Sequence, residues 1–410
     1  MAGKEHFAKL LELLEKERLA EKEENLRELK RFPLATRESL GKTVTGLVLE
    51  SMGSGLGGCA MVTVSRVPKG EELAPFHAMS AGDRALLTFP AGSQPRECEG
   101  TLYKVDEYQA VVALNCPEPS PLGRGGYQID LLGSDATYRR MKKALATAAD
   151  ARKNRTAALR EVFLGERAAD KRRSRKVRLF NESLNEFQRK AVTDSLAASD
   201  AAVIHGPPGT GKTTVLVEII RQAAAAGERI LATAPSNIAV DNMLEKLQNS
   251  GLRLVRLGHP ARTLESLRHS NLAVQIEADP AYVEVQELDA WRERLVKRKS
   301  RFGRGQLGYE EAQDRGREIT KLWREARDIE NEISRRLIAS AQVVLSTHGG
   351  LSRNLVKGSF DLVVLDEASQ ATEPLSWIPL TMGERAILAG DAMQLPPTIY
   401  SQSAAAEGLA

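Results

Sequence analysis

The residues of this chain best suited to chemistry lie between Gly206 and Thr213. They read Gly-Pro-Pro-Gly-Thr-Gly-Lys-Thr and fit the phosphate-loop pattern G-x-x-x-x-G-K-[ST] at every fixed position. Glycines let the backbone approach a ligand closely, so that successive N–H groups surround phosphate oxygens. We expect Lys212 to reach the β- and γ-phosphates of a nucleotide and the Thr213 hydroxyl to bind Mg²⁺. The expected nucleotide contacts are Gly206, Pro207, Pro208, Gly209, Thr210, Gly211, Lys212, Thr213 and Thr214.

A phosphate loop needs a strand before it and a helix after it. Ala201–Ile204 is a short apolar run typical of a buried strand, and residues 214–220 lead into an alanine-rich segment that we expect to be helical as far as Gly227. This order aims a positive helix N-terminus at the phosphates. The alternative, a Gly/Pro-rich turn with a chance lysine, does not explain the flanking elements.

Two carboxylates, Asp366 and Glu367, form a second candidate group. They directly follow the apolar run Phe360–Leu365, which predicts a strand. Metal-assisted phosphoryl transfer needs such a pair, and we expect Asp366 to hold Mg²⁺ and Glu367 to polarise the attacking water. Acidic residues at a strand end also serve as helix caps, but the phosphate loop upstream favours catalysis.

Two glutamines are candidates for sensing the nucleotide. Gln394 follows the predicted strand Ala386–Ala389 and could contact the γ-phosphate, which makes it a candidate catalytic residue. Gln188 precedes the loop, at the start of a helix predicted from Asn185, and its side-chain amide could recognise an adenine edge. A lone glutamine is more often simply solvated, and that alternative stays open for Gln188.

Polar residues also follow two further predicted strands. Pro235, Ser236 and Asn237 come after Arg229–Ala234, and Thr347 closes Gln342–Thr347. Open α/β sheets bind ligands at the carboxyl ends of their strands, so these residues are candidate ligand contacts.

Composition sets the outer limits. The chain has 410 residues, of which 42% are hydrophobic and 27% charged, as in a globular protein of two to four structural units. It lacks an apolar run long enough to span a membrane, and its Lys/Glu-rich N-terminus argues against secretion. Cys59, Cys98 and Cys116 are scattered, and we interpret them as thiols of a reducing compartment without a metal. We therefore expect an intracellular protein of the cytoplasm or nucleus.

The charge is unevenly distributed. The formal net charge is only +4, but the segment Arg139–Arg178 contains fifteen Lys/Arg against four Asp/Glu. Such a concentration favours binding to a polyanion such as nucleic acid, although solvated basic helices have the same composition.

Six stretches in this order resemble the superfamily 1 helicases of the Upf1-like group, and in particular the immunoglobulin mu-binding (SMUBP) type. They are the segment around Gln188, the phosphate loop, Ala234–Asp241, Arg256–Arg262, Asp366–Gln370 and Gly390–Thr398. The six short β-type runs between Thr43 and Leu131 predict a small antiparallel barrel, and residues 263–336 read as a helical insertion with a basic tip. Both look like accessory subdomains of that family.

The resemblance implies a RecA-like α/β fold with a parallel sheet and a definite domain order. The predicted domains are a stalk helix (1–35), the barrel (43–133), basic stalk helices (135–178), the first part of the motor domain (180–262), the helical insertion (263–336) and the second part of the motor domain (337–410).

The resemblance also implies a function. ATP with Mg²⁺ would drive 5′-to-3′ translocation on single-stranded DNA or RNA, with adenine recognition by Gln188, hydrolysis by Asp366 and Glu367, and coupling by Gln394. Strand contacts would come from Pro235, Ser236, Asn237 and Thr347, and other nucleic-acid-processing proteins are candidate partners.

Two features depart from the family pattern. Ala392-Met393 replaces a pair that is commonly polar or basic, and the sequence stops at Ala410, before the expected second motor domain with its arginine fingers. Because an arginine finger contributes about 10³ to 10⁵ in rate, we expect slow ATP hydrolysis and no unwinding by residues 1–410 alone. Two alternatives remain, a nucleotide-gated nucleic-acid-binding module without hydrolysis of its own and another kind of phosphate-loop ATPase.

Overall fold

The computed structural model divides into two compact units, Met1–Ala149 with Pro397–Ala410, and Asp150–Pro396. Each unit is described by itself. The domain boundaries predicted from the sequence remain a prediction. The structure describes residues 2–54, 60–66, 73, 77–81, 83–91, 94–106, 108–114, 125–133, 135–171, 177–258, 260, 263–301 and 309–409.

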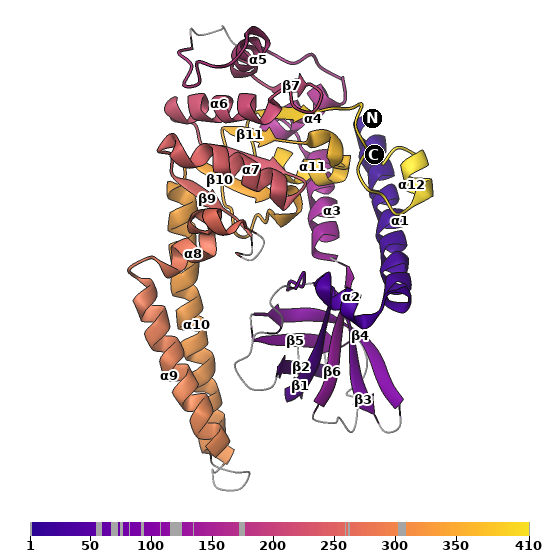
Figure 1. The fold of residues 1–410 in the computed structure, drawn as a ribbon, viewed down its shortest axis with the longest axis vertical. Helices are drawn as coiled ribbons and strands as arrows, with labels where there is room; N and C mark the ends of the chain where they lie inside the picture. Colours follow the sequence, from indigo (N-terminus) through magenta and orange to yellow (C-terminus); the bar gives the residue numbers. More distant parts are fainter. Residues whose placement is uncertain are drawn as a thin grey trace. The chain divides into compact units, whose positions relative to one another are not determined.

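The first unit is built on a closed antiparallel barrel, as the sequence predicts (Figure 1). Its strands pair in the order β1-β2-β5-β4-β3-β6. Alternate residues of each strand face inward, and Leu87, Leu102 and Val112 are completely buried in the barrel core. The strands are β1 (Thr43–Ser54), β2 (Ala60–Arg66), β3 (Arg84–Ala91), β4 (Gln94–Val105), β5 (Gln109–Leu114) and β6 (Gly125–Gly133).

Strands β3 and β4 include two prolines. Pro90 pairs opposite Pro95, and Ala91 pairs opposite Gln94. Proline has no N–H to donate to a ladder, which is why this stretch resembles a loop in the sequence. The pairing of β3 with β4 nevertheless includes both prolines.

The cysteine interpretation was wrong for Cys98. This residue lies in β4 with 7% exposure and is disulfide-bonded, whereas the sequence analysis took it for a thiol. Cys59 and Cys116 lie outside the described residues. Spacing along the chain cannot show which cysteines the strand pairing brings together, so the argument for a reducing compartment loses its basis.

The long helix α1 carries the rest of this unit. Its buried stripe consists of Phe7, Leu10 and Leu14, all at most 2% exposed, and the neighbouring Leu13 packs with the C-terminal segment. Glu17 is 7% exposed and accepts hydrogen bonds from the N–H groups of Tyr400 and Ser401 at 2.9 and 2.8 Å. The helices of this unit are α1 (Ala2–Arg31), α2 (Leu34–Ser39), α3 (Asp135–Asp150), whose last residue falls in the second unit, and α12 (Gln402–Ala406).

The second unit is organised around a six-stranded sheet, in the order β7-β12-β11-β8-β10-β9, whose paired strands are all parallel. The central strands β8 and β11 are buried along their whole length, as expected when helices cover a parallel sheet. The strands are β7 (Ala201–His205), β8 (Ile230–Ala234), β9 (Leu254–Arg256), β10 (Val343–Thr347), β11 (Leu362–Leu365) and β12 (Ala386–Gly390).

Helices connect and cover these strands, and one pair projects from them. The α/β alternation stops after β9, and α9 and α10 then run side by side as a hairpin (Figure 1). The expected basic tip of this hairpin lies partly outside the described residues. The helices of the unit are α4 (Arg155–Phe163), α5 (Glu186–Ala197), α6 (Lys212–Ala225), α7 (Asn237–Leu247), α8 (Leu272–Glu277), α9 (Tyr282–Arg301), α10 (Tyr309–Ser340) and α11 (Glu373–Leu380), with 3₁₀ turns at Gln248–Ser250, Glu265–Ser270, His348–Gly350 and Ala368–Gln370.

Among the described residues, none of the helices combines the length and apolar character needed to cross a membrane. Within the basic segment Arg139–Arg178, residues 172–176 lie outside the described residues.

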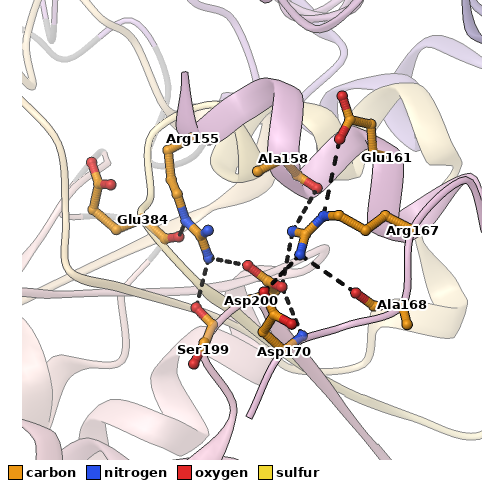
Figure 2. A network of polar contacts seen from close by, with 9 residues as sticks. All are labelled: Arg155, Ala158, Glu161, Arg167, Ala168, Asp170, Ser199, Asp200 and Glu384. Atoms are coloured by element: carbon orange, nitrogen blue, oxygen red, sulfur yellow. Dashed lines mark hydrogen bonds and ion pairs between the residues drawn. The ribbon is translucent and has the colours of Figure 1, made fainter. Parts of the chain in front are cut away.

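A buried aspartate anchors the amino edge of the sheet. Asp200 precedes β7, is 1% exposed, and binds the guanidinium groups of Arg155 at 2.6 Å and Arg167 at 2.9 Å (Figure 2). It also accepts the N–H of Asp170 at 2.8 Å. Burial raises the pKa of Asp200, but the Asp170 N–H and Arg155 outweigh burial and leave the pKa below its usual value.

We predict that Asp200→Asn lowers the free energy of unfolding by about 2–3 kcal/mol, because it leaves two arginines without their buried anion. The pKa of Asp200 is depressed in the folded protein, so its stabilisation is complete at neutral pH and is lost as pH falls through the folded-state pKa. Urea unfolding at several pH values should therefore show the difference narrowing below about pH 4.

Asp170→Asn is the matched control. Its carboxylate binds the same Arg167 at 2.9 Å, but its side chain is 74% exposed. Exposed pairs contribute about 0–1 kcal/mol, so a loss equal to that of Asp200→Asn would contradict the role assigned to burial.

Candidate nucleotide site and nucleic-acid interface

The predicted site residues gather at one edge of the parallel sheet. Because all paired strands run the same way, their carboxyl ends meet there. The candidate nucleotide residues follow β7, β12 and β11, and the candidate nucleic-acid contacts follow β8 and β10. The strand order therefore divides the edge into two adjoining halves, which meet between β11 and β8.

The phosphate loop joins β7 to α6, as predicted. Gly209 and Gly211 have φ values of +79° and +85°, a region that residues with a Cβ rarely adopt. Pro207 to Thr210 are exposed, whereas Lys212 is only 8% exposed. The Lys212 ammonium donates to the carbonyls of Gly206 and Pro207 at 2.7 and 3.3 Å, inside the loop that carries it.

Thr213 and Asp366 meet although 153 positions separate them in sequence. The Thr213 hydroxyl donates to Asp366 Oδ2 at 2.8 Å, and the Glu367 N–H donates to Asp366 Oδ1 at 3.0 Å. Asp366 is 2% exposed. Hydroxyl and carboxylate oxygens are ligands that Mg²⁺ prefers, so the predicted metal pair fits together in space.

Burial favours the protonated, neutral forms of the Asp366 and Glu367 carboxyl groups. Desolvation raises the pKa of Asp366, against the opposing hydrogen bond from Thr213 and the charge of Lys212. Desolvation and the charge of Asp366 also raise the pKa of Glu367, while Lys212 opposes the rise. Lys212 therefore acts on both carboxylates, which places the catalytic candidates in one electrostatic environment.

Glu367 has an unusual backbone. Its φ and ψ of 50° and 39° are left-handed, which costs free energy in a residue other than glycine. Gln370 Nε2 donates to Glu367 Oε2 at 3.3 Å, which helps to orient the carboxylate. Strained backbone of this kind is common at catalytic positions.

Gln188 contacts the phosphate loop directly. Its Oε1 accepts the Asn185 N–H at 3.0 Å in a capping box at the start of α5, and its Nε2 donates to the Thr210 carbonyl at 3.0 Å. A Cβ at Gly211 would lie 2.6 Å from Gln188 Nε2. The side chain is thus packed against the loop rather than simply solvated, and adenine recognition by Gln188 remains a prediction.

Gln394 depends on Asp391, to which the sequence analysis assigned no role. Gln394 Nε2 donates to Asp391 Oδ2 at 3.1 Å, and the Met393 N–H donates to Oδ1 at 3.0 Å. The Met393 N–H and Gln394 lower the pKa of Asp391. An aspartate at a strand end, three residues before the glutamine, was the signal available in the sequence.

Thr214 points to the other side of α6, where its hydroxyl accepts a hydrogen bond from Lys246 Nζ at 3.2 Å. Its predicted nucleotide contact is untested.

The nucleic-acid candidates lie beside one another on β8 and β10. Thr347 pairs in register with Ala234, the residue just before Pro235. Ser236 caps α7, and its Oγ accepts the Ala239 N–H at 3.2 Å. Thr347 Oγ1 likewise accepts the Gly350 N–H at 3.2 Å. Both hydroxyls keep an O–H to donate, and α7 presents its positive N-terminus at this edge.

Arg256 was missed as a functional candidate. It ends β9, is 1% exposed, and donates from Nη2 to Asn237 Oδ1 at 2.7 Å. In the sequence Arg256 begins one of the six family-like stretches and, with Arg253, interrupts the otherwise apolar run Leu252–Leu257, but no role was assigned to it.

We predict that Gly211→Ala reduces nucleotide affinity about tenfold or more, because the new Cβ displaces Gln188 from the Thr210 carbonyl. Gly227→Ala is the matched control at the other end of α6, with φ +84° and nothing within 4 Å of the added Cβ. Both variants should lose about 1–2 kcal/mol of folding stability. Titration with a fluorescent ATP analogue should separate them, and equal affinities would contradict the prediction.

We also predict that Asp366→Asn stabilises the fold near neutral pH. Because the pKa of Asp366 is raised, the folded protein binds the proton of this carboxyl more tightly than the unfolded chain does. The free energy of unfolding therefore falls as the pH rises from the unfolded-state pKa through the folded-state pKa. Asparagine does not ionise, so the stability of the variant relative to the parent should increase between about pH 4 and pH 7 in magnesium-free buffer. Thermal unfolding measures this, and a difference that does not change with pH would refute it.

Comparisons with known proteins agree with this geometry. Residues 183–402 match a family model described as an AAA domain, and residues 7–120 match one described as the 1B domain of helicase SMUBP-2/HCS1.

Three curated relatives cover nearly the whole chain. The DNA polymerase alpha-associated DNA helicase A of Schizosaccharomyces pombe is 33% identical over 96% of this chain and 61% of its own length. The DNA-binding protein SMUBP-2 of Mesocricetus auratus is 36% identical over 98% of this chain and 41% of its own. An uncharacterized ATP-dependent helicase of Methanocaldococcus jannaschii is 31% identical over 97% and 64%.

The chain thus spans about two fifths to two thirds of the length of these relatives. The phosphate loop, the buried Asp366 and strands β1 to β5 of the barrel occur where the two family models match. The chain therefore belongs to the AAA-domain family of Upf1-like superfamily 1 helicases, of the SMUBP type.

Proposed function

We propose that this chain is the ATP-binding and strand-binding part of an ATP-dependent nucleic-acid helicase. The observation that carries the proposal is the division of the sheet edge, where nucleotide residues on β7, β12 and β11 adjoin polar residues on β8 and β10. Membership of the helicase family supports it. Translocation in the 5′-to-3′ direction is part of the proposal and rests on the family resemblance.

The nucleotide half fits ATP with Mg²⁺. The positive φ angles of Gly209 and Gly211 suit a loop whose backbone would surround phosphates, and Lys212 lies within the loop, where it would neutralise their charge. Thr213 and Asp366 would hold Mg²⁺, which when bound supplies positive charge to the phosphate oxygens. Glu367 would orient the attacking water and accept its proton, a role that the raised pKa of its carboxylate suits.

The strand half fits a phosphate backbone. Ser236 and Thr347 offer hydroxyl donors, Asn237 offers an amide, and the α7 N-terminus adds a partial positive charge. Such donors recognise phosphates rather than base edges, so they suit single-stranded DNA and RNA alike.

The two halves share backbone. The Asp366 N–H donates to the Thr233 carbonyl at 2.8 Å, and the Thr233 hydroxyl donates to the Val364 carbonyl at 3.1 Å. Thr233 is completely buried and stands two residues before Pro235. A displacement of Asp366 on hydrolysis would therefore move the backbone of Thr233, close to the strand contacts. Gln394 and Asp391, which follow β12, would move with the nucleotide on the other side.

The proposal includes the cellular location and the partners of the protein. We propose an intracellular location, in cytoplasm or nucleus, and other nucleic-acid-processing proteins as partners. Both rest on the names of the relatives, which include a DNA polymerase-associated helicase and a DNA-binding protein.

We predict that residues 1–410 hydrolyse ATP slowly and that single strands stimulate the hydrolysis. Lys212→Ala should lose ATP binding and turnover together. Glu367→Gln should keep ATP binding and lose about 10²–10⁴ in turnover, because only proton acceptance is removed. Turnover with and without single-stranded DNA and RNA, together with binding of an ATP analogue, measures both.

Two results would replace the proposal. ATP and strand binding without turnover above that of Lys212→Ala would indicate a nucleotide-gated binding module. Turnover that single strands do not stimulate would indicate another kind of phosphate-loop ATPase.

A further inference from the structure

We propose that Arg256 is a positioning residue that turns the side-chain amide of Asn237 so that its NH₂ group faces a bound nucleic-acid strand. This inference rests on the proposed strand binding by the β8–β10 half of the sheet edge. It adds a residue outside the predicted strand contacts and assigns a chemical orientation to one within them.

The orientation of Asn237 follows from the chemistry of its neighbour. An arginine guanidinium has five N–H donors and no acceptor, so the asparagine atom 2.7 Å from Arg256 Nη2 is the carbonyl oxygen Oδ1. The Nδ2 group is then on the other side of the amide. Asn237 is the first residue of α7 and is half-buried, between the exposed Ser236 and Ile238. Within the described part of the chain, no partner is recorded for its NH₂ group, which remains free to donate.

Arg256 is rigidly held. Its Nε donates to Asp241 Oδ1 at 3.1 Å, and its Nη1 donates to the Leu257 carbonyl. The Arg256 and Asp241 side chains are 1% and 3% exposed. A buried ion pair is expensive to desolvate, and an arginine in an apolar strand end is retained at a cost in stability. The planar fork of the guanidinium meets three acceptors at once, which a lysine ammonium on a flexible stem does not reproduce.

The segment that follows β9 also holds the Arg256–Asp241 pair in place. Asp241 Oδ2 accepts the Leu264 N–H at 3.0 Å, so both carboxylate oxygens are used. Asn271 donates from Nδ2 to the Gly258 carbonyl at 3.0 Å and to Thr263 Oγ1 at 3.1 Å. A Cβ at Gly258 would lie 3.3 Å from Arg256 Nη1. The α7 start, the β9 end and the entry to the helical insertion therefore share one buried polar network, with Asn237 as its half-exposed member.

The test is a double-mutant cycle on the whole 410-residue chain. Binding of a labelled oligothymidylate is followed by fluorescence anisotropy, and stability by urea unfolding, for Arg256→Lys, Asn237→Ala and the double variant. If Arg256 acts through Asn237, each single variant weakens oligonucleotide binding about tenfold, and the double variant is no weaker than Asn237→Ala. Because the lost donor is uncharged, the dependence of affinity on salt concentration stays unchanged.

Arg385→Lys is the matched control. Arg385 is also a buried arginine, 4% exposed and paired with Glu228 at 2.7 Å, but it precedes β12 at the opposite edge of the sheet. It should lose stability as Arg256→Lys does and keep the oligonucleotide affinity of the parent. A stability loss by itself would then not account for weaker binding.

Asn237→Asp keeps the test decisive if Arg256→Lys does not fold. Aspartate retains an acceptor for Arg256, replaces the donor with an acceptor and adds a negative charge that repels phosphates, so this variant should be more stable than Asn237→Ala and bind oligonucleotide at least tenfold more weakly than the parent. Unchanged affinity would overturn the inference.

The remaining outcomes separate the two proposals. If the parent binds oligonucleotide but the effects of Arg256→Lys and Asn237→Ala multiply, or if Arg256→Lys binds like the parent, the positioning role is wrong and the proposed function stands. If the parent binds no oligonucleotide, strand binding itself is wrong, and the positioning role falls with it.

Discussion

The hydrogen bond between Thr213 and Asp366 is the contact on which the nucleotide site depends. It joins the first turn of α6 to the end of β11, and it exists only because β7, β12 and β11 are parallel neighbours with their carboxyl ends at one edge. The contact holds a carboxylate in a place where burial raises its pKa. The ionised Asp366 carboxylate lowers the stability of the fold, and binding of a cation beside it would offset that cost.

The two edges of this sheet use buried charge differently. At the amino edge, Asp200 is matched by two arginines and a backbone N–H, and its pKa is lowered. At the carboxyl edge, Asp366 has a hydroxyl and a backbone N–H, no ion pair with Asp366 occurs among the described residues, and its pKa is raised. The first arrangement stabilises the fold. The second leaves charge uncompensated where phosphates and a metal would bind, which is the pattern expected of a functional site.

The strand half of the carboxyl edge combines both arrangements. Arg256 and Asp241 compensate each other inside the protein, and their network ends at a half-exposed amide on Asn237. Charge that is satisfied internally contributes orientation rather than attraction, because its field is largely neutralised before it reaches the surface. The neighbouring Ser236 and Thr347 hydroxyls are likewise fixed by local N–H donors. The proposed strand contacts are thus uncharged donors held by rigid backbone.

The sequence by itself determined the local features of this protein. Glycine spacing predicted the phosphate loop, short β-type runs predicted the six barrel strands, and apolar runs ending in polar residues predicted where strands meet ligands. The resemblance to Upf1-like helicases of the SMUBP type followed from motif order and is confirmed by the family models. These are properties of short segments, in which steric preference and alternation act over a few residues.

Only the tertiary structure decided which distant residues meet. The pairing of Pro90 with Pro95, the disulfide bond at Cys98, the tie between Gln188 and Thr210, and the arginine at Asn237 could not be predicted. Each depends on strand pairing or packing between segments remote in the chain, and such long-range partners leave no periodic trace in sequence.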